Sequence, residues 1–201
     1  MYIDGIYYKY TDDGSALKVV RGYKPYRGKV EIPATVNGLP VTEVDGLAMY
    51  ACYYLKELVI GDNVKKCGHE AFGASINLCN VTLPVTDVEF THNWMFNCDR
   101  GIREIHCRSS IPYVVEEGIF NGAVDYDKCI LYVPVGTKQS YANSEVWKNF
   151  THIVEENVST NSSNISVERK SVWHTLQGVK LFAKPNIPGV YIHNGKKIIV
   201  R

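Results

Sequence analysis

Long apolar runs and a surplus of either charge are absent from this sequence. No apolar run approaches the roughly 20 residues that a membrane-spanning helix needs, and residues 1–5 are neither basic nor apolar as a secretory leader would be. Lysine and arginine total 22 against 21 acidic residues, so the formal net charge is +1. We therefore expect no transmembrane segment and no nucleic-acid partner. The compartment stays open: the protein is cytoplasmic, or a leader preceding Met1 has been removed.

The sequence also lacks the motifs of common catalytic and metal sites. It has no Gly-x-Ser-x-Gly, no phosphate loop and no dinucleotide fingerprint. No two of its histidines share metal-ligand spacing, and the adjacent carboxylates Asp12-Asp13 and Glu116-Glu117 fit solvated turns. We predict no catalytic residue, no metal site and no cofactor, and hence a protein that is not an enzyme. A triad assembled from distant residues is the alternative that this leaves open. The six histidines are His69, His92, His106, His152, His174 and His193.

Six cysteines are present, but there is no Cys-x-x-Cys. Their positions follow a repeat: Cys52 and Cys98 share a column with Ser75 and Ala123. Cys67 and Cys107 fall at apolar positions of their repeats. Because a free cysteine behaves as a small buried hydrophobe, we expect core packing here and not disulfides.

What is present is a strand-like triplet that recurs along the chain. A second column of large apolar residues keeps step with it, which is typical of a stack of one supersecondary unit. The third residues of the triplets are Ile32, Ile60, Leu83, Cys107 and Val133, at steps of 28, 23, 24 and 26 residues. The large apolar column is Met49, Phe72, Met95 and Phe120, at steps of 23, 23 and 25 residues.

The middle residue of each triplet is a candidate binding residue. Side chains alternate along a strand, so the outer two residues of a triplet face the core and the middle one faces away. These middle residues form a ladder on the exposed face of the predicted sheet. They are Glu31, Val59, Thr82, His106 and Tyr132.

The two ends of the stack carry different signals. Residues 1–29 read as a β-hairpin cap with strands near 3–10 and 16–20, joined by the turn residues 12–15. Residues 135–156 read as a short helical cap in which Thr137 is the expected N-cap residue and Tyr141, Trp147 and Phe150 seal the last repeat. A second short strand is expected within each repeat, at Val41–Val44 and at Val64–Cys67, turning at Gly68. The register of the third repeat, over residues 85–94, stays undetermined.

A polar, turn-rich stretch divides the chain. Residues 157–164 are expected to be a linker between a capped solenoid at 1–156, whose repeats occupy 30–134, and a small β module at 165–201. Within that module, Asn194-Gly195 between two apolar runs is a strong hairpin signal.

The repeats resemble the BspA-type leucine-rich repeat family, whose consensus runs roughly V-T-S-I-G-x-x-A-F-x-x-C-x-x-L-x-x-V-x-I-P. The match is best at Val64–Pro84 and covers about 30 to 153, with Met49 where the family has Phe and Ala123 where it has Cys. The resemblance implies a mainly β fold: a leucine-rich-repeat solenoid of about four to five repeats. It also implies an extracellular or cell-surface protein that binds host or bacterial surface proteins or glycans.

The end of the chain resembles the C-terminal sorting domain of Bacteroidetes secreted proteins, the type A or Por tail. Gly189-Val190-Tyr191-Ile192-His193-Asn194-Gly195-Lys196-Lys197 matches its motif, followed by an apolar strand and a basic end. The resemblance implies export and surface display. The alternative is a small β module that packs on the solenoid.

Two functions fit these features. The first is a binding module that uses the exposed ladder and the aromatic cluster Tyr50, Tyr53 and Tyr54 beside the strand at 58–60. The alternative for the tyrosines is that they pack under the N-terminal cap. The second function is a structural spacer or display scaffold with no ligand of its own.

Overall fold

The computed structural model describes residues 1–91, 94–98, 100–158, 173–175, 180–181, 189–193 and 196–200. The chain divides into two compact units, Met1–Val158 and Ser159–Arg201. Residues 159–164 of the linker predicted at 157–164, and the start of the module predicted at 165–201, lie outside the described residues. Each unit is described here by itself.

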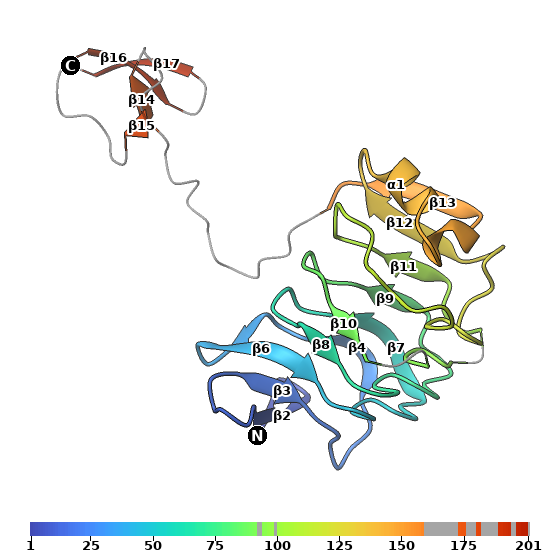
Figure 1. Cartoon of the computed structure of the whole chain (residues 1–201). Coiled ribbons are helices and arrows are strands. Elements are labelled where there is room, and N and C mark those ends of the chain that lie inside the picture. The colour runs from blue at the N-terminus through green and yellow to red at the C-terminus, as the bar shows by residue number, and fades with distance from the viewer. Residues whose placement is uncertain are drawn as a thin grey trace. The chain divides into compact units, whose positions relative to one another are not determined.

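A parallel six-stranded sheet organises the first unit (Figure 1). Neighbouring strands in this sheet are successive passes of the chain, so the unit is a β-solenoid, as the repeats predict. Five strands are the predicted triplets, and the sixth, β13, belongs to the segment predicted as the closing cap. The strands are β4 (Arg27–Glu31), β7 (Tyr54–Val59), β9 (Asn80–Thr82), β11 (Glu104–His106), β12 (Ile130–Pro134) and β13 (His152–Glu156).

In the first three coils a second strand builds another sheet, whereas the described chain between β11 and β12 has no such strand, so the expectation of one in each repeat is wrong for the fourth coil. Here β6, β8 and β10 pair in parallel, and β10 sets the register of the third repeat that the sequence left undetermined: Glu89 pairs with Lys66. The chain turns at Gly68, where a Cβ would lie 2.5 Å from the backbone nitrogen of Gly46. Only a residue without a side chain fits this approach. The strands are β6 (Leu39–Val44), β8 (Lys66–Cys67) and β10 (Glu89–Phe90), with β5 (Thr35–Val36) paired to β6.

The N-terminal hairpin extends this second sheet. β1 (Tyr2–Ile3), β2 (Ile6–Tyr10) and β3 (Leu17–Val19) run antiparallel, and β3 then pairs in parallel with β6. The predicted cap is therefore present, and it protects the edge of β6. Asp13 fixes the hairpin turn by accepting hydrogen bonds from the Thr11 and Ser15 hydroxyls, at 2.6 and 2.7 Å.

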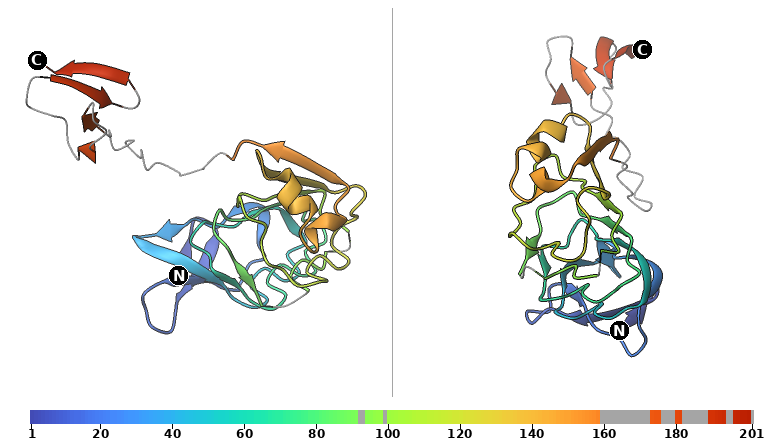
Figure 2. Two further views of the ribbon diagram at one scale, coloured as in Figure 1. Left: turned by 45° about the horizontal axis from the view of Figure 1, so that its top comes forward. Right: turned by 90° about the vertical axis from the view of Figure 1, so that its right-hand side faces the viewer.

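Both sheets contribute to one hydrophobic core, and the coils follow one another from the N-terminal cap to the closing cap (Figure 2). Phe72 stacks on Phe96, and Phe96 stacks on Phe120, with ring centroids 5.4 and 5.7 Å apart. The predicted column placed Met95 between these two phenylalanines. Met95 is buried, but its neighbour Phe96 supplies the stacked ring. The irregular third repeat shifts the column by one residue.

The closing cap consists of α1 (Lys138–Ala142), a 3-10 turn at Trp147–Asn149 and β13. Tyr141, Trp147 and Phe150 are buried there, as predicted. Thr137 occupies the N-cap position, but its hydroxyl donates to the carbonyl oxygen of Pro134 at 2.7 Å and makes no cap bond. Glu155 instead serves the start of the helix, because its Oε1 accepts from the backbone nitrogens of Lys138, the first helical residue, and of Gly136, which precedes the N-cap.

The second unit is a four-stranded antiparallel sheet in the order β15-β14-β16-β17. Its strands are β14 (Trp173–Thr175), β15 (Lys180–Leu181), β16 (Gly189–His193) and β17 (Lys196–Val200). His193 pairs with Lys196, so β16 and β17 form the hairpin that Asn194-Gly195 predicts.

All six cysteines are free thiols. Five are buried, including Cys52, Cys67, Cys98 and Cys107 as their repeat positions predict, while Cys79 is half-buried. Burial raises the pKa of the Cys98 thiol to about 12, because the thiolate loses its hydration. Within the described residues, no helix combines the length and apolar composition that crossing a membrane requires.

Candidate functional site

The predicted ladder crosses the whole six-stranded sheet. Strand pairing joins its members in order: Glu31 with Val59, Val59 with Thr82, Thr82 with His106 and His106 with Tyr132. β13 extends it, because Tyr132 also pairs with Val154. Each ladder residue keeps some exposure, whereas the flanking residues on its strand are buried. The ladder is thus a continuous row of side chains on the outer face of the sheet.

His106, near the middle of this row, contacts residues of neighbouring coils. Its ring stacks on Tyr132 with centroids 4.4 Å apart and planes 5° from parallel. Its Nδ1 lies 2.8 Å from Oε1 of Glu156, and its Nε2 lies 3.8 Å from Oε2 of Glu104. The stacked pair forms a flat aromatic platform with a carboxylate beside each ring nitrogen of His106.

A second row runs parallel to the ladder, two residues earlier in each strand. Strand pairing aligns it in the order Lys29, Glu57, Asn80, Glu104, Ile130 and His152. The two rows together carry the carboxylates of Glu31, Glu57 and Glu104 against one lysine, Lys29, which pairs with Glu31 at 3.4 Å. This sheet face is therefore open and acidic.

The tyrosine cluster lies at the start of β7. Tyr53 and Tyr54 are 52% and 59% exposed, so neither packs under the N-terminal cap. Tyr54 lies beneath Arg27, whose guanidinium carbon is 4.5 Å from the ring centroid. Tyr50 is half-buried, and its ring limits the space beside Gly73. Two of the three rings thus remain accessible to a partner.

The tyrosine cluster and the ladder occupy opposite ends of β7. Tyr54 and Val59 are five residues apart, which is about 16 Å along a strand. Lys56 is an extra residue relative to β4, so the buried Leu55 and Leu58 both face the core although they are three residues apart. A partner would need an extended contact to touch both groups.

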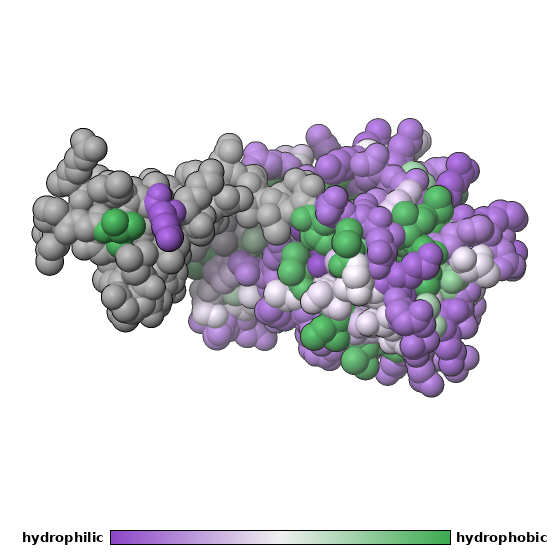
Figure 3. All heavy atoms as spheres, turned by 90° about the horizontal axis from the view of Figure 1, so that it is seen from above, coloured by the Kyte–Doolittle hydropathy of each residue, from purple (hydrophilic) through white to green (hydrophobic). Residues whose placement is uncertain are grey.

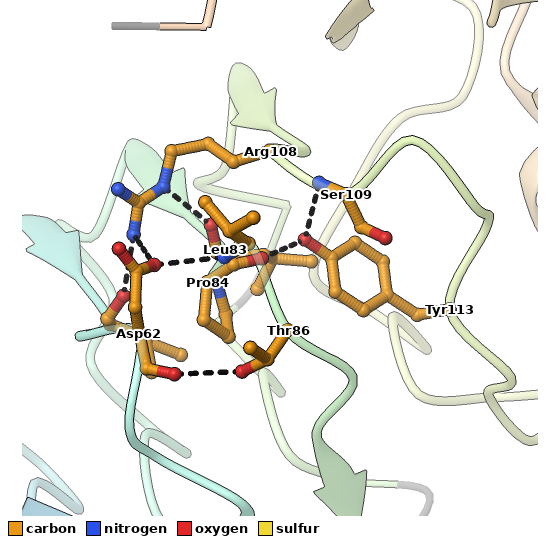
Figure 4. A network of polar contacts seen from close by, with 9 residues as sticks. Asp62, Leu83, Pro84, Thr86, Arg108, Ser109 and Tyr113 are labelled. Atoms are coloured by element: carbon orange, nitrogen blue, oxygen red, sulfur yellow. Dashed lines mark hydrogen bonds and ion pairs between the residues drawn. The ribbon is translucent and has the colours of Figure 1, made fainter. Parts of the chain in front are cut away.

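Sequence reasoning missed one polar network that joins three coils, and Figure 4 shows its part around Asp62, Arg108 and Tyr113. The Arg108 guanidinium donates to the carbonyl oxygens of Ile60 and Leu83, at 3.1 and 2.9 Å, and to Asp62 Oδ1 at 2.7 Å. The same Asp62 oxygen accepts from the backbone nitrogen of Val85 at 2.8 Å. The side chain of Arg108 is only 10% exposed, which indicates a structural role.

The network continues to the closing cap through Tyr113. The Tyr113 hydroxyl donates to the carbonyl oxygen of Pro84 and accepts from the backbone nitrogen of Ser109. The Trp147 indole donates to the carbonyl oxygen of Tyr113 at 2.8 Å, and the Tyr141 hydroxyl donates to that of Ser109 at 3.0 Å. These bonds tie the closing cap to the third and fourth coils.

Four surface cavities of about 280–520 Å³ are lined by residues between 2 and 52. Among the predicted site residues, Tyr50 and Glu31 line them. One cavity contains Asp13, whose pKa is lowered to about 2 by the hydrogen bonds of its own turn. That carboxylate is engaged in holding the hairpin. In the part of the chain that the structure describes, no three His, Cys, Asp or Glu residues gather as a metal site.

On the face seen in Figure 3, hydrophobic residues form small patches separated by hydrophilic ones. Val114 and Ile111 are nevertheless 87% and 75% exposed. Scattered exposed hydrophobes of this kind are normal on a protein surface.

No protein-family model matches the chain, and no curated protein matches it either. Two solved structures are similar. The crystal structure of a leucine-rich repeat protein of T. pallidum has a TM-score of 0.46 and 17% identity, covering 79% of this chain and 84% of that one. A leucine-rich cell surface protein from Faecalibacterium prausnitzii A2-165 has a TM-score of 0.23 and 15% identity, covering 92% of this chain and 61% of that one. Because both TM-scores are below 0.5, the assignment of a β-solenoid rests on the strand pairing of this chain.

Proposed function

We propose that this protein is a non-enzymatic binding module, secreted or displayed at the cell surface, of the BspA-like kind. The observation that carries the proposal is the continuous ladder from Glu31 to Tyr132. Its side chains point outward from a sheet whose core is held by other residues, such as Val81 and Ile105. The outward-facing residues can therefore vary to suit a partner without disturbing the fold.

The chemistry of the exposed groups supports protein or glycan recognition. The stacked His106 and Tyr132 rings, and the exposed Tyr53 and Tyr54, offer rigid amphipathic surface at low entropy cost. Host or bacterial surface proteins and glycans are the proposed partners. The ladder lies on an open sheet, which suits an extended contact better than the enclosure of a small substrate.

A binding survey tests this function. The full chain is presented to immobilised matrix proteins and glycans, and each hit is repeated with the combined variant Tyr53→Ala, Tyr54→Ala and His106→Ala. We expect the variant to weaken the hit by more than tenfold, since hot-spot aromatics commonly contribute about 2 kcal/mol or more each. The matched control is Ile111→Ala with Val114→Ala, which removes exposed apolar surface elsewhere. Equal binding by variant and wild type would exclude these residues, and a survey without any hit would favour the spacer function.

The second unit serves export in this proposal. Its hairpin and basic end are similar to a type A sorting tail, and its boundary falls at Ser159. Deleting residues 165–201 in the native host should leave the protein undisplayed, as measured by surface labelling of intact cells. Normal display of the shortened protein would contradict the export role of this unit.

A further inference from the structure

We propose that the loop from Arg21 to Arg27, at the N-terminal end of the solenoid, binds a short anionic glycan carrying sulfate or carboxylate groups. This proposal rests on the proposed binding function and adds a ligand class and a site away from the ladder. We call this loop and the tyrosines around it the basic tyrosine surface.

Cations concentrate at this loop although the whole chain is nearly neutral. Between Asp13 and Glu31 the sequence has no carboxylate but has Lys18, Arg21, Lys24, Arg27 and Lys29. The first and last of these cations have acidic partners, Asp12 at 3.9 Å and Glu31 at 3.4 Å. Arg21, Lys24 and Arg27 form no ion pair with any described residue. Three cations without a carboxylate partner create a local positive potential that attracts anions.

The loop separates two concave surfaces. One cavity, of about 310 Å³, is lined by Arg21, Tyr23 and Tyr50 among others. The other, of about 280 Å³, is lined by Tyr2, Tyr7 and Arg27 and also by the acidic residues Asp4 and Glu31. Residues 24–26 line both cavities, so the two lie on either side of that segment. Each is near the lower end of the range for small-ligand sites, which suits one or two sugar rings.

Aromatic rings complete the surface. Tyr23 is fully exposed at the loop, and its ring lies 6.4 Å from that of Tyr7. Tyr7 in turn packs on Tyr2, with centroids 4.5 Å apart. Tyrosine presents an apolar ring face beside a hydroxyl that can hydrogen-bond. A sugar ring offers the complementary apolar face and hydroxyl groups, while its sulfate or carboxylate would meet the cations.

The loop is held in shape before any ligand arrives. A Cβ at Gly22 would lie 2.0 Å from the Tyr7 ring, so only glycine allows the chain to pass there. The Tyr26 hydroxyl donates to the carbonyl oxygen of Val20 at 2.8 Å and accepts from the backbone nitrogen of Tyr7 at 3.2 Å. Tyr26 is itself buried. Fixing both ends of the loop lowers the entropy cost of binding.

A short glycan fits these observations better than a nucleic acid. The cations without an ion pair number three and lie in one loop, whereas nucleic-acid binding normally needs a longer basic track. The sheet that begins beside the loop carries Glu31, Glu57 and Glu104, which would repel a polyanion extending along it.

Binding of defined oligosaccharides by the full chain tests the proposal. The probes are a heparin hexasaccharide, the same hexasaccharide without sulfates, a hexasaccharide of a uronic-acid polymer and a single-stranded oligonucleotide of matching charge. Affinity is measured by calorimetry at two salt concentrations. We expect binding of a sulfated or uronic-acid probe that weakens with salt, and weaker binding of the oligonucleotide.

Variants assign the binding to the loop. The combined variant Arg21→Ala, Lys24→Ala and Arg27→Ala should weaken glycan binding by at least about tenfold. Each hydrogen bond from a cationic side chain to the ligand contributes substantially to the free energy of binding. Tyr23→Ala should weaken it severalfold; because Tyr23 is fully exposed, this variant keeps the fold. The matched control is Lys65→Ala with Lys66→Ala and Arg103→Ala, which removes the same charge from other exposed positions and should leave affinity nearly unchanged.

Three outcomes overturn the proposal: no binding of any anionic glycan, tighter binding of the oligonucleotide, or equal losses in the loop and control variants. The general binding function is tested separately by His106→Ala, which lies outside the loop. That variant should keep glycan affinity while losing a partner that uses the ladder. A negative result for the loop therefore does not contradict the ladder, and a negative result for the ladder does not contradict the loop.

Discussion

Arg108 stands where three other coils end their sheet strand with a proline, Pro33, Pro84 and Pro134. A proline ends a strand by removing an amide donor. Arg108 works differently, because its guanidinium reaches back to carbonyl oxygens of the two preceding coils and to Asp62. One side chain thus joins three coils, and its low exposure means that the carbonyl oxygens would have few alternative donors.

We predict that Arg108→Ala lowers the free energy of unfolding by about 1–3 kcal/mol, since buried acceptors lose their partners. Denaturant unfolding of the full chain measures this change. The control is Arg103→Ala, at an exposed position directly before β11. It should change the free energy of unfolding by less than about 0.5 kcal/mol. Similar losses in both variants would contradict the structural role of Arg108.

Among the elements, the stacked phenylalanines connect successive coils through the core. Phe96 touches both neighbours, and Phe120 then packs on Trp147 of the closing cap, with centroids 5.5 Å apart. The stack therefore links repeat to repeat and the last repeat to its cap. This is the kind of neighbour-to-neighbour contact on which solenoid stability depends.

Phe96→Ala should destabilise the solenoid by about 3–5 kcal/mol, because it removes a fully buried ring and leaves a cavity between two others. Phe96→Leu should cost clearly less, since most of the volume is kept. Thermal and denaturant unfolding compare the two variants. If Met95→Ala proved much more costly than Phe96→Ala, the column would be the one first predicted from the sequence.

At the scale of the whole molecule, both caps depend on buried tyrosine hydroxyls. Tyr8 and Tyr26 lie in the N-terminal cap, and Tyr113 and Tyr141 lie at the closing cap. Burial raises the pKa of each, that of Tyr26 to about 12, because the phenolate would lose its hydration. The ends of the solenoid therefore share one sensitivity to alkali.

We predict that stability falls in alkaline solution, starting at about pH 10. The folded-state pKa values lie above the unfolded value of about 10, so the stability that the neutral tyrosines contribute is complete below pH 10 and is lost as pH rises toward the folded-state values. Denaturant unfolding at pH 7 to 11, with tyrosine ionisation followed by ultraviolet absorbance, measures this loss. Full phenolate absorbance in a protein that remains folded would contradict it.

The sequence by itself determined the solenoid and the outward ladder. Both follow from periodicity, because a strand alternates its faces and a repeat places each strand beside the last. The hairpin at Asn194-Gly195 and the buried cysteines were equally predictable, since each depends on local turn chemistry or on a position in a repeat.

Only the tertiary structure decided the features that join residues across coils. The stacking of Phe96 in place of Met95, the sixth sheet strand, the reach of Arg108 and the exposure of Tyr53 and Tyr54 depend on which chain passes lie together. The basic tyrosine surface belongs to the same class. Its cations are visible in the sequence, but the shared cavities and the fixed loop arise only when residues from the hairpin, the loop and the first coil meet.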